Sequence, residues 1–160
     1  YKKFFNTDDK VHEKKLVMPK GTFLSRISDD QIIDIDTLMK NINEKNTFFK
    51  IDIEGNEYRI LDQIKKYSSS MNGLAIEFHN CDLHSDKIKN FINNFELQLV
   101  HIHVNNWALV NSDNSPRVIE LIFSTKDFNK KITNFQKKFP ISMDVPNNPL
   151  YEDLSIEFND

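Results

Sequence analysis

The sequence predicts an α/β fold, because stretches with the two-residue repeat of a strand alternate with stretches that have the period of an amphipathic helix. The stretches with strand character are 48–54, 74–79, 97–104 and 118–124. Two helical stretches, 56–67 and 85–95, separate the first three strands. This order is typical of a parallel sheet with flanking helices, joined by right-handed crossovers.

The first strand, FFKIDIE, runs into a glycine turn and then a helix. Gly55 supplies the turn, and Asn56 is the expected N-cap of a helix that continues to about Tyr67. The apolar stripe of this helix is Ile60, Leu61, Ile64 and Tyr67.

The second helix is expected to start at Ser85 as its N-cap. Its apolar stripe is Ile88, Phe91, Ile92 and Phe95. A short polar loop, 111–117, joins the last two strands. A loop of this length favours a hairpin, so we expect these strands to form a C-terminal antiparallel pair.

The N-terminal segment, 1–30, is polar and irregular, with a candidate edge strand at Lys15–Met18. The α/β domain is assigned to 31–160. It is expected to begin with a short strand, IIDID, and a helix capped by Asp36 or Thr37. The apolar side of that helix is Leu38, Met39 and Ile42.

A further helix is expected after Thr125, ended by Pro140, and a last strand in LSIEF. The apolar stripe of this helix is Phe128, Ile132, Phe135 and Phe139.

Composition narrows the classes of function. The chain has 160 residues, a net charge of -3 and a pI of about 6.0, which gives no electrostatic reason to bind nucleic acid. Cys81 is the one cysteine, so no intramolecular disulfide is possible, and a role as nucleophile is the less favoured interpretation. No apolar run is long enough to span a bilayer, and we expect no membrane partner and a cytoplasmic location.

Each predicted strand has one apolar face and one face with ionisable groups, since alternate residues point to opposite faces. Val100 is assigned to an apolar face with Ile102 and Val104. The opposite, polar faces carry Lys50, Asp52, Glu54, Glu77, His79, His101, His103 and Glu120. If these share one side of the sheet, they form a polar layer that is solvated, internally paired or part of a site.

Several interpretations of this layer remain open. The residue types that could bind a metal are Asp52, Glu54, His79, His84, His101 and His103. Their spacing matches no metal motif, so no metal ligand is assigned. A carboxylate or histidine could instead act as a general base, or the layer could hydrogen-bond a polar ligand.

The stretch KIDIEGNEYRIL resembles the signature of the FkbM-type methyltransferases, which use S-adenosylmethionine. The matching residues are Lys50, Ile51, Asp52, Glu54, Gly55, Glu57 and Leu61. Downstream, HIHVNNW, VIELIFSTK and PNNPLYED are similar to the second half of such proteins, and the resemblance covers about 30–155.

The resemblance implies a Rossmann-like methyltransferase sheet with a terminal antiparallel strand. It also implies O-methylation of a hydroxyl on a sugar or a sugar-containing metabolite. For the catalytic side it suggests Glu54, His79 and His101. For the substrate-binding side it suggests Asp52, His103, Asn105, Asn106 and Trp107.

The first half of the family fold has no counterpart here. Its glycine-rich loop cannot be built from three scattered glycines, so no cofactor-binding residue is assigned and weak or absent binding of S-adenosylmethionine is expected. The chain starts at Tyr1 and looks like a C-terminal half, inactive without the other half. The alternatives are a non-catalytic binding or oligomerisation module and a metal-dependent enzyme.

Loss of the first strands would expose an edge of strand 48–54. We expect residues 1–30 to shield that edge, or two chains to pair there as a homodimer.

Overall fold

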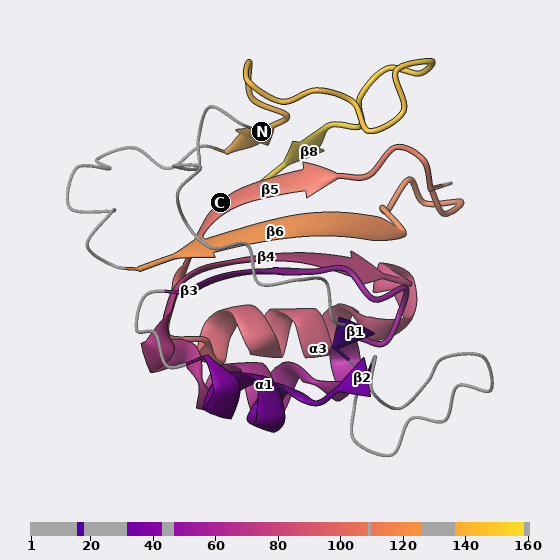
Figure 1. Cartoon of the computed structure of the whole chain (residues 1–160). Helices are drawn as coiled ribbons and strands as arrows, with labels where there is room; N and C mark the ends of the chain where they lie inside the picture. The colour runs from indigo at the N-terminus through magenta and orange to yellow at the C-terminus, as the bar shows by residue number, and fades with distance from the viewer. Residues whose placement is uncertain (1–15, 18–31, 43–46, 109, 126–136, 159–160) are drawn as a thin grey trace.

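The computed structural model of the chain describes residues 16–17, 32–42, 47–108, 110–125 and 137–158. Its centre is a mixed sheet of four strands, and the fold is α/β as predicted (Figure 1). The strands of this sheet are β3 (Thr47–Ile51), β4 (Met71–His79), β5 (Gln98–Val104) and β6 (Val118–Ser124). The α-helices are α1 (Ile35–Asn41), α2 (Leu61–Lys66) and α3 (Cys81–Asn94).

The strand order in this sheet is β3-β4-β6-β5. β3 pairs in parallel with β4, whereas β6 is antiparallel to both β4 and β5. β3, β4 and β5 therefore run in one direction, and the predicted antiparallel pairing of the last two of these strands is confirmed. Since β4 and β5 are parallel, α3 is the helix of the connection between them.

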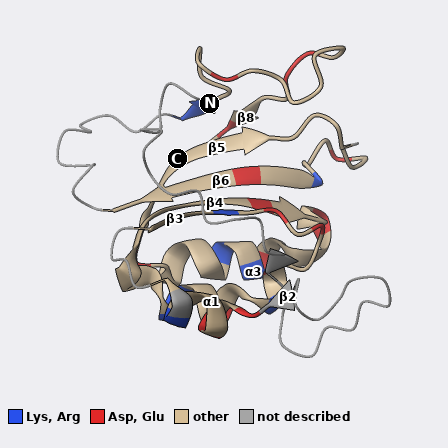
Figure 2. Ribbon diagram, in the orientation of Figure 1, with Lys and Arg blue, Asp and Glu red and all other residues tan. Residues whose placement is uncertain are grey.

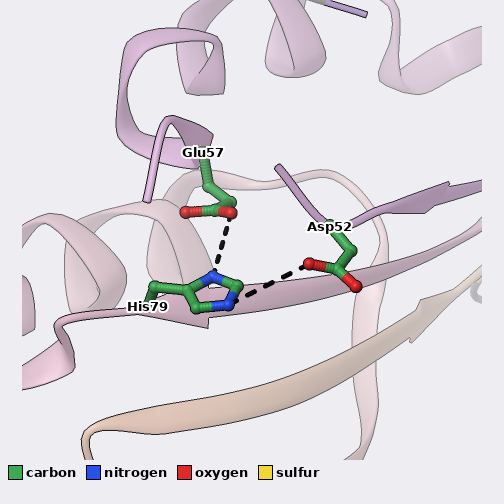
Figure 3. A group of neighbouring side chains, drawn as sticks. All are labelled: Asp52, Glu57 and His79. Carbon is green, nitrogen blue, oxygen red and sulfur yellow. Dashed lines mark hydrogen bonds and ion pairs between the residues drawn. The ribbon is translucent and has the colours of Figure 1, made fainter. Parts of the chain in front are cut away.

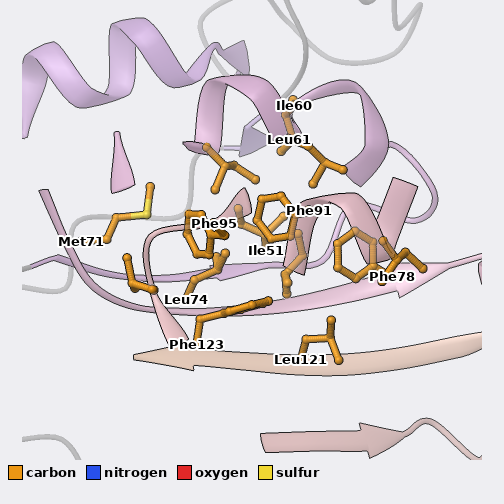
Figure 4. Packing of buried hydrophobic residues seen from close by; sticks show 14 of the residues in the cluster. Ile51, Ile60, Leu61, Met71, Leu74, Phe78, Phe91, Phe95, Leu121 and Phe123 are labelled. Carbon is orange, nitrogen blue, oxygen red and sulfur yellow. The ribbon is translucent and has the colours of Figure 1, made fainter. Parts of the chain in front are cut away.

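Apolar side chains from one face of this sheet pack against α2 and α3 (Figure 4). The sheet contributes Ile51, Leu74, Ile76, Phe78, Leu121 and Phe123. The helices contribute Ile60, Leu61, Ile64, Ile88, Phe91 and Phe95, as their stripes predict. The ring of Phe91 stacks on Phe95 and meets Phe123 edge-on at centroid distances of 4.7 and 5.6 Å. The polar face of the sheet is left free of this core.

Helix α1 begins earlier than expected. β2 is confined to Ile32–Ile33, and Asp34 rather than Asp36 or Thr37 is the N-cap, because its carboxylate accepts a hydrogen bond from the backbone N–H of Thr37. Asp36 instead accepts hydrogen bonds from Lys66 and Tyr67 and so joins α1 to the end of α2.

The helix predicted after Gly55 is divided in two. A 3₁₀ turn, η2 (Glu57–Arg59), precedes α2. Asn56 makes no side-chain cap; its amide donates to the carbonyl of Ile53. A second 3₁₀ turn, η3 (Ser68–Ser70), leads into β4.

Helix α3 begins at Cys81, four residues before the predicted cap at Ser85. His84 has non-helical φ and ψ angles, so the helix is kinked there. The segment after the kink carries the predicted apolar stripe.

The end of the chain differs from the prediction. Residues 126–136 of the predicted last helix lie outside the described residues, but Phe139 belongs to a strand, β7 (Lys138–Phe139). A proline disfavours the helical conformation of the residue before it, and Pro140 follows Phe139. β7 pairs antiparallel with β8 (Ile156–Glu157), which confirms a strand in LSIEF.

The predicted N-terminal strand is confirmed as β1 (Leu16–Val17), which pairs in parallel with β2 in a separate small sheet. The rest of 1–30, and with it most of the expected shield, lies outside the described residues. Within the described part, β1 does not pair with β3, and β3 is an edge strand of the main sheet. No helix in the described ranges is long and apolar enough to cross a membrane.

Candidate functional site: the polar face of the sheet

The strand register places the ionisable groups on one side of the sheet. Glu120 of β6 pairs with Glu77 on the neighbouring strand β4 and with His103 on the neighbouring strand β5. One step along, Lys50 pairs with Ala75, Ala75 with Ile122, and Ile122 with His101. Figure 2 shows acidic positions on the neighbouring strands β4 and β6 and at the turn beside the end of β4. Alternation alone does not show whether the polar residues share one side of the sheet. The strand register shows that those on β3, β4, β5 and β6 do, so the polar layer is a property of this fold.

One assignment of a face was wrong. The β5–β6 register shifts between Leu99 and His101, so Val100 is the extra residue of a bulge. Val100 is exposed instead of lying on the apolar face with Ile102 and Val104. The bulge keeps both Leu99 and Ile102 opposite apolar residues of β6 while His101 and His103 stay on the polar side.

The C-terminal segment, 137–158, covers the β5–β6 half of the polar face. His101 Nε2 lies 3.0 Å from Asp144 Oδ1, and His103 Nε2 lies 2.8 Å from Asp153 Oδ2. His103 Nδ1 is also 3.6 Å from Glu120 Oε2. We call these five side chains the tail contact. No periodic pattern predicts a role for Asp144 or Asp153, because both lie in irregular segments.

The tail contact alters the protonation of His103. Burial alone would lower its pKa, but the hydrogen bond with Asp153 and the negative charges of Asp153, Asp144 and Glu120 raise the pKa above its usual value. His103 therefore favours the imidazolium form that its neighbours stabilise.

Asn106 and Trp107, both predicted to bind substrate, also meet the C-terminal segment. The buried Asn106 amide donates to the carbonyl of Asn148 and accepts from the backbone N–H of Asn148. Its polar atoms are thus used to hold the segment in place. The Trp107 indole N–H donates to the carbonyl of Asn147, while 66% of the residue surface stays exposed.

The other half of the polar face lies at the carboxyl ends of β3 and β4. After β3 the chain turns sharply, with positive φ angles of 54° at Glu54 and 94° at Gly55. Glu57 is fully buried below this turn, and its Oε1 accepts hydrogen bonds from the backbone N–H groups of Ile53 and Gly55. The acidic position of the signature therefore holds the turn in shape.

The same oxygen of Glu57 contacts His79 at the end of β4, 3.1 Å from its Nδ1 (Figure 3). The other ring nitrogen, Nε2, faces three carboxylates. Its distances are 3.4 Å to Glu54, 3.7 Å to Glu77 and 4.0 Å to Asp52. We call the four carboxylates and His79 the His79 cluster.

Two further hydrogen bonds fix the cluster. The Tyr58 hydroxyl donates to the backbone carbonyl of His79 at 2.6 Å, and Asn105 donates to Glu77 at 2.8 Å. Burial raises the pKa of Glu77; the hydrogen bond from Asn105 opposes this, while the charges of Asp52 and Glu120 add to it. The cluster thus holds more negative charge than its own donors balance.

The structure divides the sequence-predicted site into these two groups. Asp52, Glu54, His79 and Asn105 belong to or contact the His79 cluster. His101, His103, Asn106 and Trp107 contact the C-terminal segment instead. The site assignment missed Glu57, although the signature contains it; its burial depends on the turn and was not readable from periodicity.

Cys81 lies in a different place. A cavity of about 670 Å³ along the start of α3 and the loop before β6 includes Cys81, Ser85 and Asn111 in its lining. Burial raises the pKa of the Cys81 thiol to about 11, and the thiol donates to the carbonyl of Phe78. A neutral, hydrogen-bonded thiol is a poor nucleophile, which argues against a catalytic role.

Comparisons with models of protein families, with curated proteins and with solved structures gave no match. Arguments about function therefore start from the two groups on the polar face.

Proposed function

We propose that this chain forms the acceptor-binding part of an FkbM-like O-methyltransferase. The observation that carries the proposal is the shape of the signature itself. Gly55 makes the turn, Glu57 binds that turn from below, and Asp52 and Glu54 face His79 at the ends of two parallel strands. Ligands of open α/β sheets bind beyond the carboxyl ends of parallel strands. β6, the last strand of the main sheet along the chain, is antiparallel to its neighbours, which agrees with the antiparallel strand that the family resemblance implies.

In this proposal, the chain recognises a hydroxyl and removes its proton. Glu54, with 85% of its side chain exposed, is the most exposed proton acceptor of the cluster, and His79 Nε2 lies 3.4 Å from it. His101 is held by Asp144, which makes it a group that shapes the wall of the site. Trp107 presents an exposed ring that suits stacking on a sugar.

The residues present do not suit S-adenosylmethionine itself. The chain has three glycines, and only Gly55 and Gly73 fall within the described ranges. They lie at the turn after β3 and within β4, so they cannot form a glycine-rich cofactor loop. We assign no cofactor contact and derive no transfer step. The proposed partner is a small hydroxyl compound such as a sugar, and the proposed location is the cytoplasm.

An NMR titration tests the proposal, because Trp107 is the one tryptophan and gives one indole N–H signal. Methyl glycosides of hexoses, deoxyhexoses and uronic acids are added in turn at millimolar concentration. We expect at least one to shift the indole signal, and expect a smaller shift with Glu54→Gln. S-adenosylmethionine should leave the indole signal unshifted and should give no binding heat in calorimetry. If no glycoside shifts the indole signal, the proposed acceptor binding is wrong. If S-adenosylmethionine binds tightly, the statement that this chain does not bind the cofactor is wrong.

A second candidate is an assembly module that pairs through β3. Its support is that β3 is an edge strand of the described sheet, with Phe48 45% exposed. Lys50, also exposed on β3, works against such pairing, since charged residues protect edges. Sedimentation equilibrium showing a monomer would reject this candidate.

A further inference from the structure

Hydrogen bonding sets the tautomer of His79. Glu57 Oε1 accepts from two backbone N–H groups, so it is an acceptor toward the imidazole as well. His79 Nδ1, 3.1 Å away, must then carry the hydrogen. If the ring is neutral, the lone pair of His79 lies on Nε2, on the far side of the ring from Glu57 (Figure 3).

That Nε2 atom faces oxygen atoms of Asp52, Glu54 and Glu77 at 3.4 to 4.0 Å. A lone pair that faces three anions is unfavourable, and either a proton or a metal ion bound at Nε2 relieves it. The nearest cation among the described residues is Lys50, whose Nζ lies 3.7 Å from Asp52 on the exposed side. Among the described residues, Lys50 is thus the one lysine or arginine within 4.0 Å of any of the four carboxylates.

Burial makes the missing charge costly. Glu57 is fully buried, and its second oxygen, Oε2, has no hydrogen-bond partner within the described ranges. The side chain of Glu77 is 8% exposed. Buried carboxylates destabilise a fold unless a donor or a cation compensates them.

We propose that His79 Nε2, Asp52 and Glu77 bind one divalent metal ion, with Glu57 as the outer carboxylate that orients the ring. A carboxylate that accepts from the second nitrogen of a ligand histidine is the usual arrangement around protein-bound metals. Asp52, Glu57 and His79 place potential ligand atoms within 4.8 Å of one another, and Glu77, which is not in that group, lies 3.7 Å from Nε2. Glu54, at the exposed rim, adds a fourth ligand when its side chain turns toward the bound ion.

The carboxylates must move toward one another to close the site. Each of the three already has an oxygen 3.4 to 4.0 Å from Nε2, and metal–oxygen bonds of about 2.1 Å would bring neighbouring ligand atoms to about 3 Å. One imidazole with several carboxylates suits Mn²⁺, which accepts both kinds of ligand. This inference does not rest on methyl transfer, since the cluster is defined without a cofactor or an acceptor.

The test measures Mn²⁺ binding to the whole chain by electron paramagnetic resonance, in which the signal of free Mn²⁺ falls as the ion binds. We expect one site per chain. Asp52→Asn should weaken binding at least tenfold, because it removes a charged ligand from a half-exposed position where folding is not at risk. The matched control is Asp62→Asn on α2, whose side chain is 95% exposed and lies outside the cluster.

A second variant tests the outer carboxylate. Glu57→Gln retains an oxygen for the backbone N–H groups but not the charge, and should weaken Mn²⁺ binding by roughly 10- to 100-fold. Mn²⁺ should also raise the melting temperature of the unaltered chain and leave that of Asp52→Asn unchanged. The proposal is overturned if millimolar Mn²⁺ and Zn²⁺ both fail to bind, or if Asp52→Asn and Asp62→Asn weaken binding equally. Neither S-adenosylmethionine nor a sugar is present, so this failure is separate from that of the proposed function.

Discussion

The two halves of the polar face come from the same alternation of residues and differ in how their charges are matched. In the tail contact, His101 and His103 each have a carboxylate of the C-terminal segment at 3.0 Å or less. In the His79 cluster, four carboxylates surround one imidazole. Within the described ranges, the C-terminal segment covers the first half and pairs its charges, whereas the second half lies open and has an excess of carboxylates.

This difference separates polar residues that are paired within the fold from those that we propose bind a ligand. Buried ion pairs that complete one another hold segments together and need nothing further. A cluster that stays unbalanced at the carboxyl ends of parallel strands is where a ligand gains most from binding. We therefore place the centre of the proposed site at the His79 cluster rather than over the whole polar layer.

The largest expected loss of stability comes from disrupting the ion pairs of the covered half. His103→Ala leaves the buried Asp153 carboxylate, 10% exposed, without its partner, and should lower the free energy of unfolding by about 3 kcal/mol. Urea denaturation measures it. The double variant with Asp153→Ala should cost less than the sum of the single variants, and strict additivity would show that the pair does not hold the segment.

The next effect concerns the turn below the open half. Glu57→Ala removes the acceptor of the Ile53 and Gly55 N–H groups and should cost about 2 kcal/mol. Glu57→Gln keeps that oxygen and should cost clearly less in the same denaturation experiment. Equal losses for both variants would mean that charge, and not the backbone hydrogen bonds, governs this turn.

A pH series distinguishes the halves further. The pKa of His103 is raised in the fold, so its stabilisation is complete below the unfolded value of about 6.5 and is lost as pH rises through the folded pKa. The stability difference between the unaltered chain and His103→Gln should shrink as the solution is made alkaline. A difference that grows with pH would contradict the assigned charge state.

The smallest expected change in stability is a gain, whereas the variants above lose stability. The raised pKa of Glu77 means that stability falls as pH rises from the unfolded value of about 4.3 to the folded pKa. Glu77→Gln should therefore be slightly more stable than the unaltered chain at neutral pH and equal to it in acid. Thermal melts with Mn²⁺ should reverse the order at neutral pH, since the metal stabilises only the chain that keeps its ligand.

Much of this arrangement follows from local sequence. Alternation in FFKIDIE and LAIEFH was enough to predict which residues face the core. Of the stripe predicted for α2, Ile60, Leu61 and Ile64 are buried and Tyr67 is partly buried. These features depend on neighbours within a few positions, which is the range over which periodicity carries information.

The rest depends on contacts between distant residues. The bulge at Val100, the pairing of Asp153 with His103 and the burial of Glu57 all arise when separate segments meet. Phe139 shows the same limit, since its helical spacing was overridden by pairing with Ile156 in β8. The sequence therefore predicted the polar layer but not its division into two halves.

The two halves also differ in how far apart along the chain their partners stand. Glu57 and His79 are separated by 22 positions, whereas His103 and Asp153 are separated by 50. Closing a shorter loop loses less chain entropy and is generally faster. During synthesis, every member of the His79 cluster has emerged before Asp144 and Asp153 exist. The open half is then positioned to assemble first, and the C-terminal segment closes over a sheet whose ligand-facing end is already in place.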